Sequence, residues 1–314
     1  MNGSDTLNRD GLIGPWAGPP VPWTEEDLFD EETMRADVAR ICQAGIPGLF
    51  CGGTTGEFYA METDEFRRVS AALVEECRSW DTPAMVGCTS TYTLGAAQRA
   101  AWAGEIGASA ILVALPYWIE VGEEYVVPFF FDVARASGNL PLCIYETRRA
   151  KKALTLAQHH AIKEAVPSYI MVAANHDTIG TQPQGCEALT PFVNVFVPEN
   201  RWSVLGPAGA IGSCSSFVYW NPRIMLGLWE KVRARDWAAV SEMAPKIQAL
   251  YDYVSANLVA NGFTDTAIDR IGGRASGFLG TSLRCRGPYP SATNDEVEHL
   301  RRWYGENFPD MLEL

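Results

Sequence analysis

Short apolar runs recur along this chain and alternate with longer amphipathic segments, and this alternation restricts the possible folds most strongly. The runs at 48–51, 110–114 and 169–173 are apolar at every position. A strand without a polar face is buried on both sides, which is typical of parallel sheets covered by helices. Further strands are predicted near residues 12–13, 84–86, 142–145 and 193–197 and within 206–213.

This pattern gives about eight strand–helix units before residue 225, the number found in a (β/α)8 barrel. A doubly wound open sheet is the alternative, but no G-x-G-x-x-G motif follows the first strand. After residue 225 the strand pattern stops, and helices are predicted at 229–235, 236–260 and 294–307. We therefore predict an α/β fold, a TIM barrel over residues 1–225, with a C-terminal helical extension (226–314) packed on the barrel.

Charge and hydropathy argue against two classes of partner. The 314 residues include 25 basic and 38 acidic side chains, a formal net charge of −13. Nucleic acids and anionic membranes bind cationic surfaces, so we expect neither as a partner. No run reaches about 18 apolar residues, and the polar N-terminus lacks the apolar core of a signal peptide. We expect a cytoplasmic protein.

The cysteines and histidines do not predict a metal site. No two of the eight cysteines are spaced C-x-x-C, and several lie inside apolar runs. This usage is typical of small buried side chains in a reducing compartment. The four histidines do not complete a zinc site, and we expect His159 and His160 at the surface of a helix.

Polar residues follow several predicted strands, where catalytic groups lie in a barrel. The sequence Gly-Gly-Thr-Thr-Gly-Glu follows the strand at 48–51. The hydroxyls of Thr54 and Thr55, together with backbone N–H groups next to Gly53, can converge on an anion such as a carboxylate. A plain turn is the other interpretation. Tyr145 ends the fifth predicted strand and Ala173 the sixth.

These residues carry a family resemblance. The elements at 53–57, 116–117, 144–145 and 209–212 resemble the dihydrodipicolinate synthase / N-acetylneuraminate lyase superfamily, in order and spacing over roughly residues 10–300. The resemblance implies a class I pyruvate aldolase barrel, usually a homotetramer, without a cofactor. It also implies that a lysine on the sixth strand forms a Schiff base with a 2-oxo acid. The tyrosine of the fifth strand would move protons, and the threonine pair would bind the carboxylate.

Within the superfamily, the chain is more similar to the hydratase-aldolases, which cleave benzylidenepyruvates to an aromatic aldehyde and pyruvate. The residues that carry this similarity are Trp118, Ala150 and Lys152. A tryptophan suits an aromatic substrate through stacking. Alternatively, Trp118 or its neighbour Tyr117 packs at a subunit interface.

The Schiff-base lysine of the family is missing from this chain. The family places it 28 residues after the strand-five tyrosine, which is position 173, an alanine. Lys163 precedes the strand and is expected on a helix surface. Lys151 and Lys152 lie on a loop, where a solvated amine is a poor nucleophile. Either Ala173 is a deliberate replacement of lysine, which we favour, or the protein diverged and lost the covalent step.

Three further residues are candidates for the pocket. Asn175 and His176 follow the sixth strand, and His176 has the chemistry of an acid–base group or of a loop hydrogen-bonding residue. Cys214 is expected at the pocket floor but has no histidine base nearby in sequence. Glu146, next to Tyr145, should point away from it by strand alternation; the alternative is that it reaches the pocket from the strand end.

Three functions stay open at this point. The leading one is a carbon–carbon lyase that releases an aldehyde and pyruvate. The second is a non-enzymatic 2-oxo acid binder or regulator. The third is a different lyase or a dehydratase that uses Tyr145 and His176 without an imine.

Overall fold

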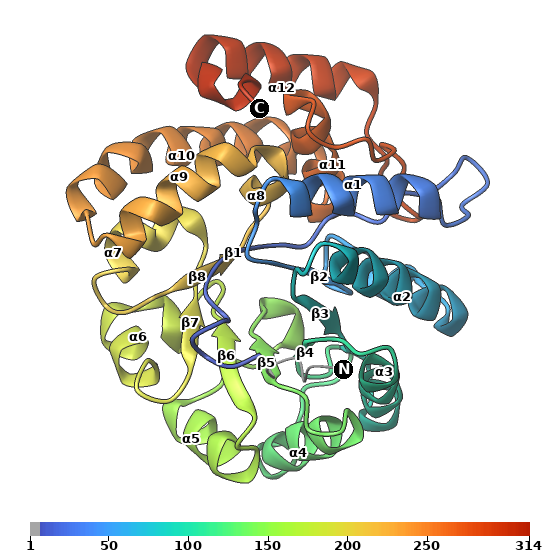
Figure 1. The fold of residues 1–314 in the computed structure, drawn as a ribbon, viewed down its shortest axis with the longest axis vertical. Coiled ribbons are helices and arrows are strands. Elements are labelled where there is room, and N and C mark those ends of the chain that lie inside the picture. The colour runs from blue at the N-terminus through green and yellow to red at the C-terminus, as the bar shows by residue number, and fades with distance from the viewer. Residues whose placement is uncertain (1–6) are drawn as a thin grey trace. The chain divides into compact units, whose positions relative to one another are not determined.

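The computed structural model describes residues 7–314, in which eight parallel strands form a closed barrel in the order β1 to β8 (Figure 1). The predicted barrel is therefore confirmed. The strands are β1 (Gly14–Ala17), β2 (Gly48–Cys51), β3 (Ala84–Gly87), β4 (Ala110–Val113), β5 (Leu142–Tyr145), β6 (Tyr169–Ala173), β7 (Asn194–Phe196) and β8 (Gly212–Cys214).

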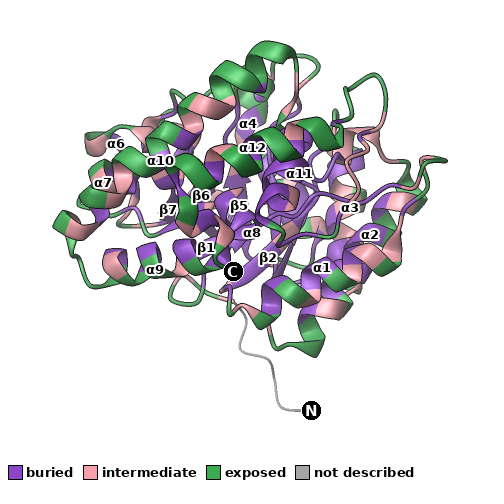
Figure 2. Ribbon diagram, turned by 90° about the horizontal axis from the view of Figure 1, so that it is seen from above, coloured by how far each residue is buried: buried purple, intermediate pink, exposed green. Residues whose placement is uncertain are grey.

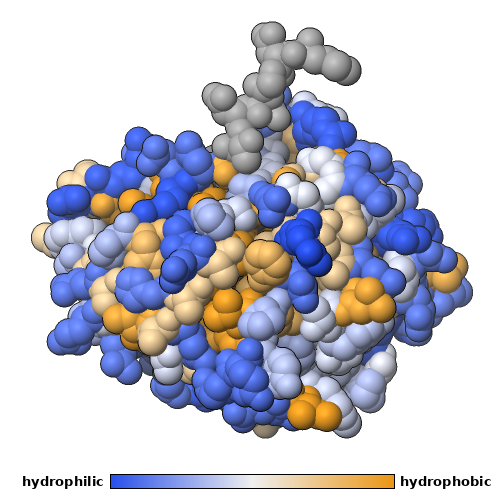
Figure 3. Space-filling view, turned by 90° about the horizontal axis from the view of Figure 1, so that it is seen from below, coloured by the Kyte–Doolittle hydropathy of each residue, from blue (hydrophilic) through white to orange (hydrophobic). Residues whose placement is uncertain are grey.

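Burial explains the apolar strands. In β3, β4 and β6 every residue is buried, and Figure 2 colours most of the strand ribbon as buried. Only a sheet covered on both faces removes all these side chains from water. Hydrophobic residues also reach the surface, where Figure 3 shows them among hydrophilic ones on one face.

Helices follow the strands along the chain. They are α1 (Glu31–Gln43), α2 (Thr63–Ser79), α3 (Thr93–Glu105), α4 (Val126–Ala136), α5 (Leu156–Ala165), α6 (Pro183–Leu189), α7 (Trp202–Leu205) and α8 (Phe217–Trp220). Thr63 is the first residue of α2, whereas Glu62 caps the helix in a reciprocal capping box with Glu65.

The C-terminal part is helical, as predicted. Its helices are α9 (Pro222–Arg233), α10 (Trp237–Asn257), α11 (Asp265–Ser276) and α12 (Asn294–Asn307). Helix α11 was not among the predicted helices, and nearly all its residues are buried. Over residues 7–314, no helix is both long and apolar enough to cross a membrane.

The described chain divides into two compact units. The first consists of Pro83–Cys214 and the residues up to Gly14, and contains strands β3 to β8 with helices α3 to α7. The second consists of Pro15–Thr82 and Ser215–Leu314, and contains β2, α1, α2 and α8 to α12. Each unit carries a separate group of candidate site residues.

Candidate active site

In the first unit, the two central candidates stand at the ends of neighbouring strands. Strand β5 ends at Tyr145 and β6 ends at Ala173, as the sequence predicts. The sheet register pairs these two residues directly, and the N–H of Glu146 donates to the carbonyl oxygen of Ala173 at 3.0 Å. Residues paired in register point to the same face of a sheet, so Tyr145 and Ala173 share a face.

Gly180 shows which face this is. It lies in a short 3-10 helix (Ile179–Thr181) that packs on α6, and a Cβ at this position would stand 2.6 Å from the Cβ of Ala174 and 3.3 Å from Val195. Ala174 therefore points toward the helices. Because side chains alternate along a strand, Ala173 points to the barrel side. Its register partner on β7 is Phe196.

Lys163 does not supply the missing amine. It lies on α5, and its Nζ donates to the carbonyl oxygens of Pro167 at 2.9 Å and Tyr169 at 2.6 Å. Tyr169 begins β6, and Ala173 ends it four residues later, about 13 Å away at the usual rise of a strand. Lys163 is thus held at the wrong end of the strand.

The two loop lysines are engaged in other contacts. Lys151 donates to the carbonyl oxygen of Trp118 at 2.5 Å. Lys152 forms an ion pair with Glu123, which raises the pKa of its amine. An amine with a raised pKa is a poorer nucleophile at neutral pH, so neither the contacts nor the charge favour an imine on this loop.

Glu146 points away from Tyr145, as strand alternation predicts. Its carboxylate accepts from the N–H of Leu154 at 3.1 Å and lies 3.7 Å from Nε2 of His159. Nδ1 of His159 lies 2.9 Å from the hydroxyl of Tyr169. The expectation that His159 lies at the surface is wrong, because α5 turns it into the core, whereas His160 is exposed. Glu146 therefore anchors the loop after β5 from behind.

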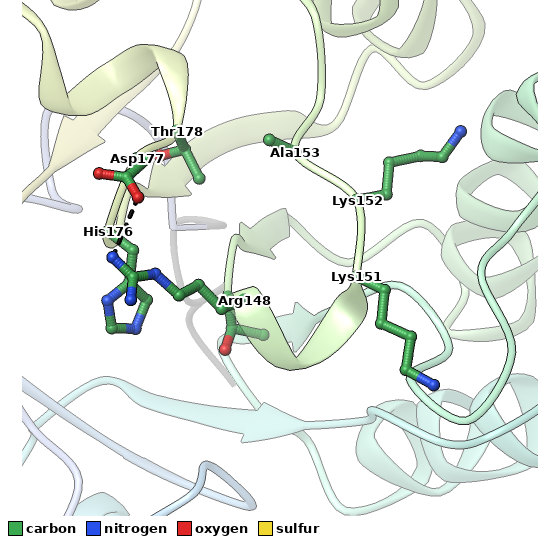
Figure 4. Close-up of a pocket in the computed structure, with 8 residues that line it drawn as sticks. Arg148, Lys151, Lys152, Ala153, His176, Asp177 and Thr178 are labelled. Atoms are coloured by element: carbon green, nitrogen blue, oxygen red, sulfur yellow. Dashed lines mark hydrogen bonds and ion pairs between the residues drawn. The ribbon is translucent and has the colours of Figure 1, made fainter.

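A cavity of about 200 Å³ lies beyond the ends of β5 and β6, and its lining includes Arg148, Lys151, Lys152, His176 and Asp177 (Figure 4). Arg148 extends toward Asp177 and pairs with it at 3.0 Å, while Lys151 and Lys152 extend away from it. His176 is exposed in a left-handed conformation, with φ of 58°. The structure thus places His176 and Lys152 on one cavity.

Asn175 and Cys214 also lie at strand ends. The amide of Asn175 donates to the carbonyl oxygen of Glu146 at 3.3 Å and so joins the loops after β5 and β6. Cys214 ends β8, and burial raises the pKa of its thiol to about 12. A thiol with this pKa holds its proton at neutral pH, so Cys214 is not a nucleophile.

Trp118 lies on the loop after β4 and is 75% exposed. The ammonium of Lys151 lies 6.0 Å from the centre of its ring, within the range of a cation–π contact. An exposed aromatic ring held by a cation is available to a ligand or to another subunit.

In the second unit, the candidate anion site is a turn that follows β2, the Thr54–Thr55 turn (residues 53–57). The N–H of Glu57 donates to the carbonyl oxygen of Thr54 at 3.0 Å. Gly53 is buried, and a Cβ there would stand 3.0 Å from the Phe50 ring. Both threonines are half-buried. The turn therefore keeps both hydroxyl-bearing residues within reach of a ligand.

The hydroxyl of Thr55 already has a partner. It is hydrogen-bonded to the carboxyl group of Asp269 on α11, and the Thr55 carbonyl oxygen accepts from the Thr266 hydroxyl at 2.7 Å. Burial raises the pKa of Asp269 to about 7, while hydrogen bonds from Ser216, Thr55 and Tyr219 oppose that rise. The turn is thus attached to a buried carboxyl group that titrates near neutral pH.

Glu57 closes the turn with a structural ion pair. Its carboxylate accepts from Trp23 Nε1 at 2.6 Å, from Arg270 at 2.5 Å and from the N–H of Arg286 at 2.9 Å. The Glu57 and Arg270 side chains are fully buried. The glutamate of the Gly-Thr-Thr-Gly-Glu sequence therefore fixes the turn rather than contacting a ligand.

Comparison with known proteins identifies the family. A model of the Dihydrodipicolinate synthetase family matches residues 13–303. The chain belongs to this family. It is 25% identical over 228 residues to a 4-hydroxy-tetrahydrodipicolinate synthase of Thermus thermophilus, an alignment that covers 72% of this chain and 76% of that protein.

Solved structures share the fold of this dihydrodipicolinate synthetase family member. PhdJ bound to a substrate intermediate has a TM-score of 0.85 at 21% identity, and the match covers 99% of both chains. A catalytic lysine mutant of the Ruminococcus gnavus sialic acid aldolase has a TM-score of 0.84 at 16% identity, covering 97% of this chain and 99% of that one. The family match confirms the dihydrodipicolinate synthase part of the resemblance drawn from the sequence, and these structures confirm the fold.

The main residues that the sequence interpretation missed are Asp269, Tyr219 and Ser216 around the threonine turn. No motif marks them. Asp269 lies on α11, Tyr219 lies on α8 and Ser216 directly precedes α8, so all three are far from the turn in sequence. A weak signal for α11 exists, because Thr264 and Asp265 precede the apolar residues 267, 268 and 271. Such a start is typical of a helix N-terminus. It does not indicate that Asp269 faces the turn.

Proposed function

We propose that this chain has the site of a carbon–carbon lyase of the pyruvate-dependent class I aldolase type, with alanine in place of the Schiff-base lysine at position 173. The direct register pairing of Tyr145 with Ala173, on the barrel side of β5 and β6, supports this most strongly. The side chain of a lysine at position 173 would leave the sheet directly beside Tyr145, the register partner of residue 173 on β5. Its buried, apolar neighbour Phe196 would favour a neutral and therefore nucleophilic amine.

The reaction of a lysine-containing chain follows from this arrangement. The amine attacks the carbonyl carbon of a 2-oxo acid, and loss of water gives an iminium ion. With an unsaturated substrate, water first adds across the carbon–carbon double bond and supplies the hydroxyl group that becomes the aldehyde oxygen. This hydroxyl then loses its proton, the iminium accepts the electron pair of the adjacent carbon–carbon bond as that bond breaks, and the aldehyde leaves. Tyr145 moves protons to and from the reacting oxygen and carbon atoms. Hydrolysis of the imine then returns pyruvate and the free amine, so we propose no cofactor.

We propose an aromatic substrate of the hydratase-aldolase kind, an unsaturated or hydroxylated 2-oxo acid. The exposed ring of Trp118 offers a stacking surface for its aromatic part. Asn175, His176, Lys152 and Cys214 are proposed contacts at the strand ends. Separately, the Thr54–Thr55 turn with Gly53 is proposed to bind a carboxylate.

The alanine has two explanations under this proposal. In the first, which we favour, it replaces a lysine and leaves a binding site without covalent chemistry. In the second, the protein is a native homologue that binds 2-oxo acids as a regulator, or dehydrates them with Tyr145 and His176. We further propose a cytoplasmic homotetramer without nucleic acid or membrane partners.

Aldehyde release tests this function. We expect the Ala173→Lys variant to release an aromatic aldehyde and pyruvate from a benzylidenepyruvate, and the present chain to release neither. Ala173→Met is the matched control, because it fills a similar volume without an amine. Release by the methionine variant or by the present chain would contradict a role for an amine at position 173 and would favour a lyase that works without that imine. If the three proteins bind the 2-oxo acid and none of them releases an aldehyde, the regulator is favoured.

A further inference from the structure

A carboxyl group lies buried behind the Thr54–Thr55 turn, and the reaction proposed above does not use it. Asp269 is 3% exposed and bonds the Thr55 hydroxyl. Ser216 and Tyr219 also hydrogen-bond its side chain, and Trp220 Nε1 donates to its carbonyl oxygen at 3.2 Å. Three hydroxyl groups from two other segments thus converge on one carboxyl group.

The charges around Asp269 favour a proton on it. The neighbouring Asp265 on the same helix is a like charge that raises the Asp269 pKa. On α8, the phenol of Tyr219 is buried, and its raised pKa keeps it neutral. Arg270 follows Asp269 in sequence, but its guanidinium is bonded to Glu57. Because Arg270 is paired with Glu57, the hydrogen-bond partners of the Asp269 carboxyl group are hydroxyl groups.

The protonation of Asp269 decides which atom the Thr55 hydroxyl offers to a ligand. An ionised carboxylate only accepts, so Thr55 must spend its single hydrogen on Asp269. The lone pairs of Thr55 would then face an incoming carboxylate, which is unfavourable. A protonated Asp269 can donate to the Thr55 oxygen instead, and this frees the hydroxyl hydrogen for the ligand.

We propose that Asp269 is a positioning residue for the Thr54–Thr55 turn, and that its proton sets the direction of the Thr55 hydroxyl, so that a carboxylate binds there together with a proton. The carboxylate ligand rests on the function proposed above. Because burial brings the pKa of Asp269 to about 7, Asp269 gains or loses this proton in the neutral pH range. Above that pH, the affinity for a carboxylate should fall by about tenfold per pH unit.

Calorimetry of pyruvate binding tests this coupling. The present chain is titrated in two buffers of different ionisation enthalpy, about one pH unit above the Asp269 pKa. We expect an uptake of about one proton per pyruvate bound. Asp269→Asn should bind without uptake, whereas Asp265→Asn, the same change one turn earlier on α11, should retain it. Pyruvate binding without proton uptake in the present chain would overturn the inference and leave the proposed function standing.

Infrared titration of the unliganded chain provides a readout that needs no ligand. A protonated-carboxyl stretching band should disappear near neutral pH and be absent in Asp269→Asn. Thr55→Val should move its disappearance to higher pH, because valine no longer donates to the carboxylate. If no 2-oxo acid binds, the proposed function fails, and this titration decides the role of Asp269. Absence of the band, or a midpoint that Thr55→Val does not move, would overturn it.

Discussion

Replacing Glu57 with glutamine should destabilise the fold by about 3–5 kcal/mol. The size of the side chain hardly changes, because an amide group takes the place of one carboxylate oxygen. The carboxylate serves three donors: Trp23, Arg270 and the N–H of Arg286. Glutamine offers one acceptor oxygen and an amide group that donates, so at least one donor would face another donor.

The charge accounts for most of this magnitude. The Glu57 and Arg270 side chains are both fully buried. Removing the carboxylate leaves the Arg270 guanidinium inside the protein without its counter-ion, and breaking a buried pair in this way is the costly case. Hydrogen bonds from Arg270 to the Val21 carbonyl at 2.7 Å and to Thr281 at 3.1 Å remain, but they do not neutralise the charge.

Urea unfolding, followed by tryptophan fluorescence, measures the loss. Glu230→Gln is the matched control, because Glu230 pairs with Arg233 at 3.0 Å while 66% exposed, and an exposed pair contributes about 0–1 kcal/mol. The double variant Glu57→Leu with Arg270→Met should regain much of the stability. A Glu57→Gln loss as small as that of the control would refute the argument that this ion pair fixes the turn.

Three further predictions concern Asp269, the threonine pair and assembly. Since burial raises the pKa of Asp269 from 3.8 to about 7, the folded chain holds a proton there that the unfolded chain has lost. The free energy of unfolding should therefore fall by on the order of 4 kcal/mol as pH rises between these values. Asp269→Asn should lack this component of the pH–stability curve. Equal slopes of the two curves over this pH range would contradict the prediction. Replacing Thr54 and Thr55 together with valine should weaken pyruvate binding by about 2–4 kcal/mol in calorimetry, and unchanged affinity would place the carboxylate elsewhere. Sedimentation at micromolar concentration should show a tetramer, with Tyr117 or Trp118 near a subunit interface, and a monomer would count against it.

The barrel could be predicted because its strands lack a polar face. Residues 48–51, 142–145 and 169–173 were predicted as strands with the bounds that the structure gives them. A strand that is buried on both sides is apolar at nearly every position, and this pattern can be recognised in the local sequence alone. The first strand was less well placed, at 12–13 instead of Gly14–Ala17, because glycine and proline there hide the apolar pattern.

The candidate site could be predicted only where spacing along the chain fixes position. The interval between Tyr145 and Ala173 spans one strand–helix–strand unit, so sequence spacing translates into register. Asp269 meets Thr55 across 214 residues, and no local pattern encodes such a contact. The burial of His159 was missed for a related reason, since its partners come from other elements: Tyr169 begins β6, and Glu146 directly follows β5.

The proposed function depends most on position 173 being the Schiff-base position of the barrel. The Ala173→Lys variant is incubated with pyruvate, reduced with borohydride, digested and mapped by peptide mass spectrometry. We predict one reduced pyruvate adduct, on the lysine at 173, and no adduct in the present chain or in Ala173→Met. An Ala173→Lys protein that folds and forms no adduct there, or a present chain modified at Lys151 or Lys152, would contradict the account.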